Sequence, residues 1–349
     1  MKILLDFGFG YFINARTGVG KYEENIIFGL KNKYDIIALE NSLAPLPENA
    51  NPIYLCGLRK KLSRIIRFLF SADYLYKNYD VVITGSACYR KSRNVKQIPI
   101  VHDLMSFTEP QNYTLKKRFE NWIAAKSLKN AYKIIAVSNT TKQALHDLFK
   151  IDFNLIYVLP NITDFYLRER NPKDFLFIGD MRKTKNLDYL IKGFHDYKLN
   201  YHSEERLIIA GNKKFEFENL QTIVKNLNLD KDVIFTGYVD ECEKIKLFSN
   251  AKGLVFISNN EGFGIPLLEA NVNCIPVLCS DIPVFHEVIS EQGGVFVNNK
   301  DIKAISSGMF QLQNFKIRES YSLELRNRYS KKIFSELLEN LINSISPSS

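Results

Sequence analysis

The chain has 349 residues, of which 46% are hydrophobic and 24% charged, so we expect two globular domains and exclude a disordered or fibrous protein. No apolar run approaches the ~18 residues of a membrane-spanning helix, and Asp6 stands where a signal peptide would still be apolar, so a cytoplasmic protein is expected. The formal net charge of +9 lies entirely before Phe165, in a segment with 23 basic and 14 acidic residues. This excess indicates an anionic partner or a solvated basic surface.

In the first half, Ile- and Val-rich runs alternate with amphipathic stretches of helix length, a pattern typical of parallel βαβ units. Strands are predicted at 2–7, 35–39, 80–83, 98–102, 133–137 and 156–159. Helices are predicted at 20–30, 58–76, 115–129 and 139–149. The segment 163–173 has four charges followed by Asn171-Pro172 and no strand pattern, which is typical of a linker.

The second half repeats the pattern, so the fold class is α/β with two doubly wound, Rossmann-like domains whose binding loops face a shared cleft. Strands are predicted at 175–179, 207–211, 233–236, 253–257, 275–279 and 294–297, and helices at 186–197, 220–226, 241–249 and 265–271. A last helical region at 320–343 is long enough to leave its own domain and brace the other. We expect domains at 1–163 and 174–325, joined by a linker at 164–173, and a bracing segment at 326–349.

No metal or cofactor site is predicted. The five cysteines contain no C-x-x-C pair, and the five histidines show no zinc-binding spacing. Asp230-Lys231-Asp232 has the D-x-D spacing that holds a divalent cation in some sugar-transfer enzymes, but it precedes a strand, at the end opposite the ligand-binding edge. A surface turn is the better interpretation of it.

Three loops are candidates for binding an anionic ligand. Gly8 and Gly10 begin a dinucleotide fingerprint that lacks its third glycine, whereas Gly18 and Gly20 stand at a helix start, where amides can approach an anion or simply form a tight turn. The second domain opens with Gly179 and a basic loop at 180–186, whose arginine and lysines suit a diphosphate or remain solvated.

The strongest local motif spans 259–270 and follows a predicted strand. It carries two carboxylates, Glu261 on a loop and Glu269 one turn into a helix, with Gly262 and Gly264 leaving amides accessible and Pro266 at the helix start. Glu261 can therefore face a reacting group while Glu269 accepts hydroxyls of a ribose; a structural helix cap is the alternative.

Glu261 to Glu269 forms E-x7-E with G-F-G-x-P inside it, and with this motif the chain resembles the retaining GT-B glycosyltransferases of family 4. The resemblance covers nearly the whole chain. It includes five further blocks in the expected order, at 17–22, 102–104, 137–141, 179–186 and 235–239. Two departures are Thr184, where an arginine often precedes the lysine of the diphosphate loop, and Cys274, where a glycine is common.

The resemblance implies a nucleoside-diphosphate sugar donor, GDP- or UDP-linked, and transfer of its hexose with retention to a saccharide acceptor in bacterial surface polysaccharide or lipopolysaccharide assembly. The implied catalytic residues are Glu261, His102, Arg182 and Lys185; a core histidine is the alternative for His102. The implied donor-binding residues are Gly18, Gly20, Lys183, Tyr238, Gly262, Phe263, Gly264, Ile265 and Glu269, with Arg182 and Lys183 both candidates for the diphosphate role. Cations then neutralise the leaving phosphate without a metal.

Other classes remain open. They are a sugar-nucleotide epimerase or a non-catalytic sugar-nucleotide-binding protein of the same architecture, and a nicotinamide-dependent dehydrogenase, for which Glu40 could suit a ribose. No nucleic-acid partner is expected, because the basic segment lacks an aromatic platform for bases.

The predicted helix at 58–76 places five basic residues before a run of aromatic ones, among them Phe68 and Phe70. This arrangement suits an anionic membrane surface. We therefore expect peripheral docking on the inner face of the membrane and a lipid-linked acceptor.

Overall fold

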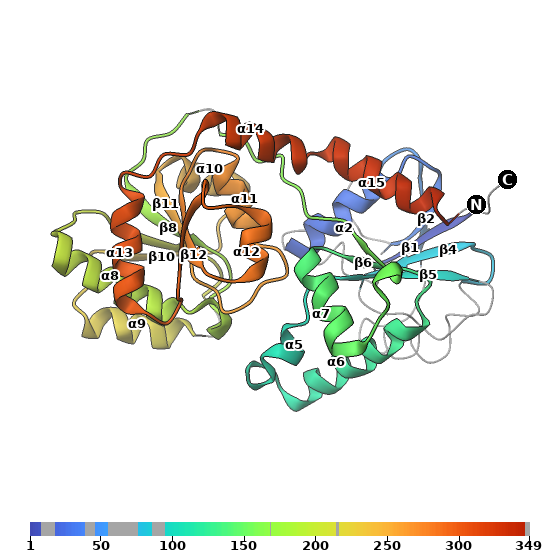
Figure 1. Ribbon diagram of the computed structural model, residues 1–349, viewed down its shortest axis with the longest axis horizontal. Coiled ribbons are helices and arrows are strands. Elements are labelled where there is room, and N and C mark those ends of the chain that lie inside the picture. The colour runs from blue at the N-terminus through green and yellow to red at the C-terminus, as the bar shows by residue number, and fades with distance from the viewer. Residues whose placement is uncertain are drawn as a thin grey trace. The chain divides into compact units, whose positions relative to one another are not determined.

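The computed structural model describes residues 1–7, 18–38, 46–54, 76–85, 95–167, 169–213 and 216–345. It divides into two compact units, Met1–Ile162 with Tyr329–Ser349 and Thr163–Arg328. Each unit is a parallel β-sheet with helices packed on it, as expected for Rossmann-like α/β domains (Figure 1). The predicted helix at 58–76, apart from Tyr76, and the loop at 8–17 lie outside the described residues.

The first unit has a seven-stranded sheet in the order β3-β2-β1-β4-β5-β6-β7. Its strands are β1 (Ile3–Asp6), β2 (Tyr34–Ala38), β3 (Ala50–Tyr54), β4 (Val81–Thr84), β5 (Lys96–Val101), β6 (Ile134–Ala136) and β7 (Ile156–Val158). Its α-helices include α2 (Gly18–Gly29), α5 (Met105–Thr108), α6 (Leu115–Ser127), α7 (Asn139–Phe149) and α15 (Lys331–Asn343). Sequence analysis missed β3, because Pro52 interrupts the strand pattern; proline is tolerated there since β3 is an edge strand paired only with β2.

The second unit has a six-stranded sheet in the order β10-β9-β8-β11-β12-β13. Its strands are β8 (Asp174–Ile178), β9 (Leu207–Ala210), β10 (Val233–Gly237), β11 (Ala251–Phe256), β12 (Val277–Ser280) and β13 (Gly294–Val297). Its α-helices are α8 (Leu187–Tyr201), α9 (Phe217–Asn226), α10 (Glu241–Ser249), α11 (Ile265–Asn271), α12 (Pro283–Val288), α13 (Ile302–Leu312) and α14 (Glu319–Arg328). The six predicted strands all appear, and none of their ends is shifted by more than two residues.

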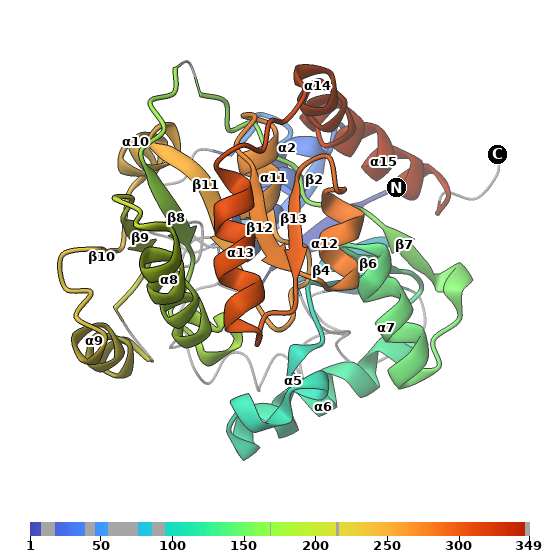
Figure 2. The ribbon, with the colours of Figure 1, turned by 60° about the vertical axis from the view of Figure 1, so that its left-hand side comes forward.

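Two helices of this unit were not predicted. α12 has only six residues, too few to show a helical period in the sequence. α13 is capped by Asp301, whose side chain accepts a hydrogen bond from the Ala304 amide at 3.0 Å. α13 lies beside α8 against the sheet (Figure 2). The two helices approach closely because Gly193 has no side chain: a Cβ there would lie 2.4 Å from Ile305 Cγ2.

The helical region predicted at 320–343 is present, and the chain forms two helices there. α14 ends at Arg328, and α15 begins after Ser330, whose hydroxyl accepts a hydrogen bond from the Ile333 amide at 3.3 Å. α15 then packs on α2 within the first unit, where the Tyr22 and Phe334 rings meet edge to face at 5.7 Å.

The segment predicted as a linker packs on the second unit. The Asn171 amide donates to the Ser249 carbonyl at 2.8 Å, and the Arg170 guanidinium donates to the carbonyls of Cys274 at 2.7 Å and Ala251 at 2.8 Å. The change of unit therefore falls before this segment, after Ile162. Across the part of the chain that is described, none of the helices combines the length and apolarity needed to cross a bilayer.

Candidate active site

The candidate site lies where the strand order of the second unit reverses. β8 and β11 are neighbours in the sheet although the strands β9 and β10 separate them in the chain. In doubly wound sheets, ligands bind outside the carboxyl ends of the strands at this point. The loop after β8 contains Lys185 and the loop after β11 contains Glu261; the two loops are joined by a hydrogen bond from the Asn259 amide to the Thr184 carbonyl at 2.8 Å.

Three asparagines hold these loops in place. The Asn186 side-chain amide donates to the Ile257 carbonyl at 3.1 Å and to the Asn259 side-chain oxygen at 2.6 Å. Asn299 donates to the Ser258 carbonyl at 3.1 Å. Asn186 adopts the left-handed conformation (φ 52°) at the start of α8, which asparagine tolerates better than most residues. Buried amides with several partners make these loops rigid.

Lys185 and Glu261 form an ion pair. Their side chains are only 15% and 12% exposed, and Lys185 Nζ also lies 5.1 Å from the centre of the Phe256 ring. Two predicted catalytic residues, 76 positions apart, are thus in direct contact. Without a ligand the carboxylate satisfies the lysine that was assigned to the diphosphate, so a bound phosphate would share Lys185 with Glu261.

A second ion pair joins Lys244 and Glu269. Lys244 Nζ lies 2.5 Å from Glu269 Oε1 and 4.5 Å from the centre of the Phe165 ring, and the two side chains are 12% and 5% exposed. No donor among the described residues contacts Oε2, which remains able to accept a hydroxyl. Sequence analysis missed Lys244 because a single lysine on the polar helix α10 carries no signal of a partner 25 residues away.

The glycine-rich segment between the two carboxylates leads into α11. Gly264 is the residue before the helix, with φ +100°. A Cβ there would lie 3.0 Å from the Phe285 ring, so a side chain would strain the backbone and crowd this ring. Phe263 is buried, whereas Gly262 and Ile265 are partly accessible. Pro266 stands in the first turn of α11, as the motif predicted.

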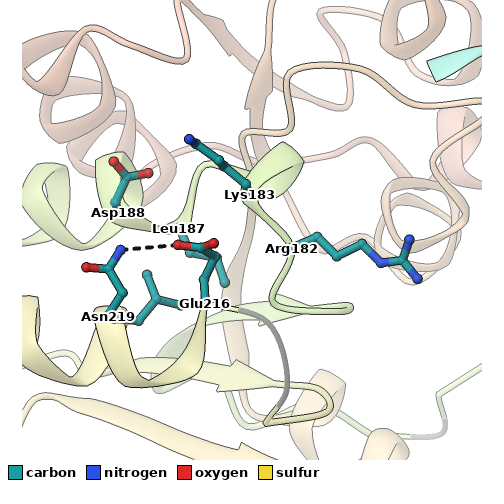
Figure 3. Close-up of a pocket in the computed structure, with 7 residues that line it drawn as sticks. Arg182, Lys183, Leu187, Asp188, Glu216 and Asn219 are labelled. Atoms are coloured by element: carbon teal, nitrogen blue, oxygen red, sulfur yellow. Dashed lines mark hydrogen bonds between the residues drawn. The ribbon is translucent and has the colours of Figure 1, made fainter. Parts of the chain in front are cut away.

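The two candidates for the diphosphate role line one pocket, with Leu187, Asp188 and Glu216. Their side chains point in different directions (Figure 3), and Arg182 Nε lies 3.5 Å from Asp180. Asn219 also lines this pocket and donates to Glu216 at 3.2 Å (Figure 3). The lining thus holds two cations and two carboxylates, and both Arg182 and Lys183 stay candidates for the diphosphate role.

The remaining predicted residues of this unit are less enclosed. Tyr238 follows β10 and is 48% exposed. Asp232 belongs to the turn before β10 and lies 2.7 Å from Lys198 Nζ, an ion pair that suits a surface turn. Within the described ranges, no group of three or more His, Cys, Asp or Glu side chains has the geometry to hold a metal ion.

In the first unit, His102 follows β5 and packs edge to face on Tyr22 at 5.1 Å. Burial lowers the pKa of His102 from 6.5 to about 4, so the ring is neutral at pH 7. Its Nε2 is buried and has no hydrogen-bond partner among the described residues. Buried polar atoms usually have a hydrogen-bond partner, so this nitrogen is a candidate to bind a ligand hydroxyl. Gly18 and Gly20 lie in the first turn of α2, the former exposed and the latter buried.

Cys274 adopts the left-handed conformation with φ 54°. Glycine is the residue that occupies this conformation without a steric penalty, which gives a physical reason for the glycine that resembling sequences commonly have here. This departure therefore concerns backbone strain.

Individual proteins resemble the chain in sequence or in fold. "O-antigen chain mannosyltransferase RfbU" of Salmonella typhimurium is 32% identical over 216 residues, which are 61% of this chain and 60% of that protein. A sucrose-phosphate synthase from Thermosynechococcus elongatus superposes with a TM-score of 0.80 at 16% identity, covering 99% of both chains. Anabaena Alr3699/HepE, in a structure with UDP and glucose, superposes with a TM-score of 0.74 at 14% identity, covering 99% of this chain and 100% of that one.

Two family profiles cover most of the chain. The family described as Glycosyltransferase Family 4 matches residues 17–165, and the family described as Glycosyl transferases group 1 matches residues 160–333. Each match falls largely on one of the two Rossmann-like units, the arrangement of a GT-B fold. The chain belongs to the GT-B glycosyltransferases of family 4.

Proposed function

We propose that the chain transfers a hexose from a nucleoside-diphosphate sugar to a saccharide acceptor, with retention at the anomeric carbon. The observation that carries the proposal is the pair of buried ion pairs, Lys185–Glu261 and Lys244–Glu269, beside the switch point of the second unit. They supply a cation for a phosphate, a carboxylate for a sugar and a second carboxylate for a ribose, each already oriented.

Lys185 is assigned to the departing phosphate. Breaking the bond between the anomeric carbon and the phosphate oxygen moves negative charge onto the nucleoside diphosphate. A lysine that is 15% exposed and held by Glu261 interacts with this charge more strongly than a solvated lysine would. In front-face attack, the leaving phosphate takes the proton of the acceptor hydroxyl, so Glu261 orients the sugar ring and does not attack it.

Glu269 is assigned to the ribose. Lys244 contacts its Oε1 and fixes the direction of the carboxylate, and Oε2 accepts the ribose hydroxyls. His102 is assigned to a sugar hydroxyl, because its neutral ring and partnerless Nε2 can make one hydrogen bond without a change of charge.

The acceptor is proposed to be a lipid-linked saccharide of bacterial surface polysaccharide or lipopolysaccharide. The name of the Salmonella relative, an O-antigen chain mannosyltransferase, supports this class of acceptor and favours mannose as the hexose. An acceptor with a lipid anchor places the reaction at the inner face of the membrane, with this protein bound peripherally.

The first experiment is a thermal-shift panel of GDP, UDP and their sugars, followed by a transfer assay with the donor that stabilises the protein most. Glu269→Ala should mainly raise the donor KM, and Glu261→Ala should mainly lower kcat. If both variants change KM alone, the division of roles is wrong. Isomerised donor without transfer would identify an epimerase, and binding without turnover would identify a non-catalytic binding protein.

A further inference from the structure

An apolar stripe lies exposed on α6 in the first unit. Leu115, Phe119 and Trp122 follow one another at helical spacings of four and three, so they share one face. Their exposed fractions are 79%, 62% and 44%, and the Phe119 and Trp122 rings stack with centres 6.0 Å apart. A folded chain rarely leaves three large apolar side chains together in water without a use for them.

The helix is attached to its unit at one end. Ala125 is its buried residue, and Leu128, in the 3₁₀ turn that follows, is buried in the core between β5, β6 and α7. Its residues 115–120 are all exposed, and α6 runs along the rim of the unit, away from α2 and α15 (Figures 1 and 2). An exposed stripe on the rim of a unit can contact an extended surface, whereas a small molecule would need an enclosed pocket.

Basic residues surround the stripe. The helix has four basic residues, Lys116, Lys117, Arg118 and Lys126, and one acidic residue, Glu120. The Glu120 carboxylate lies 3.6 Å from Lys117 Nζ. Lys126 Nζ lies 3.7 Å from the centre of the Trp122 ring, so the cation sits directly over the aromatic face. Aromatic side chains with adjacent cations suit the boundary between lipid headgroups and acyl chains, where the ring inserts and the cation meets an anionic headgroup.

We propose that α6 is a membrane-docking element that binds the headgroup region of an anionic bilayer through Leu115, Phe119 and Trp122. The inference rests on the proposed function only in that a lipid-linked acceptor would meet the enzyme there. The charge of α6 favours anionic lipid over a second copy of the chain. In a symmetric contact, a second copy would place its own four basic residues against the four of α6, whereas anionic lipid complements them.

Trp122 is the only tryptophan in the chain, so its fluorescence reports this helix alone. Full-length protein is titrated with vesicles of pure phosphatidylcholine and with vesicles containing phosphatidylglycerol, at low and high salt. Docking predicts a blue shift and quenching by bromine-labelled acyl chains with the anionic vesicles, weakened by salt. An equal response to neutral vesicles, or none to either, overturns the proposal, and so does a blue shift that grows with protein concentration alone.

Two variants keep the tryptophan and change the rest of the surface. Leu115→Ser with Phe119→Ser, and Lys116→Glu with Arg118→Glu, should each weaken vesicle binding roughly tenfold or more. All four residues are exposed, so folding is preserved. The matched control is Leu199→Ser on α8, an exposed leucine (61%) of the second unit, which should bind vesicles as the unchanged protein does.

Nucleotide binding separates this proposal from the proposed function. A thermal shift with nucleoside diphosphates does not require a membrane, so it should be equal in the unchanged protein and in both α6 variants. Retained nucleotide shifts without vesicle binding would overturn docking alone. Vesicle binding without any nucleotide shift would leave docking intact and contradict the proposed reaction.

Discussion

The two units share a parallel-sheet architecture but differ in how their polar side chains are paired. In the second unit, two carboxylates near the switch point are each buried against a lysine, at Lys185–Glu261 and Lys244–Glu269. In the first unit, His102 Nε2 has no partner among the described residues, and α6 leaves an apolar stripe in water. The comparison indicates that the second unit is preorganised for a charged ligand, whereas the first offers groups that an incoming partner must satisfy.

The largest expected effect comes from breaking the deeper pair of the second unit. Lys244→Met leaves the carboxylate of Glu269, 5% exposed, without a counter-charge, so the free energy of unfolding should fall by about 3–5 kcal/mol. Urea denaturation followed by circular dichroism measures this loss. Lys244→Met with Glu269→Leu should recover most of it, because no buried charge remains.

The control for that pair is Lys192→Met. Lys192 lies 3.9 Å from Asp188 and both side chains are more than a third exposed, so its loss should cost less than about 1 kcal/mol. If Lys244→Met lowers the free energy of unfolding no more than Lys192→Met does, the buried ion pairs do not stabilise the second unit and the comparison fails.

Removing the cation of the other pair tests catalysis. Lys185→Ala should lower kcat about 100- to 1,000-fold, on the order of 3–4 kcal/mol of transition-state stabilisation, because the leaving phosphate loses its buried partner. Steady-state transfer at saturating donor gives this number, with the exposed Lys303→Ala as the control. A rise of the donor KM with kcat unchanged would assign Lys185 to binding and remove it from the chemistry.

A pH titration tests the first unit. The folded protein holds the pKa of His102 at about 4, below the 6.5 of an unfolded chain, so between these values the unfolded state binds more protons. Stability contributed by the neutral ring is therefore complete above pH 6.5 and is lost as the pH falls towards 4, by at most about 3 kcal/mol. Denaturation of the unchanged protein and of His102→Phe across this range should give a flatter profile for the variant; parallel profiles contradict the assignment.

A smaller gain is expected at Cys274, in the second unit. Cys274→Gly should raise the free energy of unfolding by about 1 kcal/mol, because glycine adopts φ 54° without the steric penalty of a Cβ. Thermal denaturation checks the sign. The hydrogen bond from Arg170 to the carbonyl of this residue does not depend on the side chain, so it persists in the variant.

The smallest effect is expected from chelation. If Lys185 and its neighbours neutralise the leaving phosphate, transfer should survive EDTA with its rate unchanged. Loss of activity on chelation, restored by magnesium or manganese, would show that the cations of the second unit are insufficient by themselves.

Sequence periodicity predicted most of the described elements. α7, α10 and α11 appear with the predicted bounds, since each has a local signal: Ser138 and Asp240 accept hydrogen bonds from amides of the first turn, and Pro266 starts α11. The break between α14 and α15 was not predicted, although Ser330 accepts a hydrogen bond from the Ile333 amide and so caps α15. The strand β3 was missed because Pro52 is acceptable only at a sheet edge, and edge position is not a local property.

The candidate site shows the same division. The sequence by itself determined the fold class and the placement of Glu261 on a loop and Glu269 on a helix, since turn, cap and period signals act over a few residues. The family followed from the resemblance of its motifs. Only the tertiary structure decided that Lys185 meets Glu261 across 76 residues and that Lys244 meets Glu269 across 25. Strand order brings these residues together, and burial makes each pair strong, so both the partners and their strength depend on contacts that no local pattern encodes.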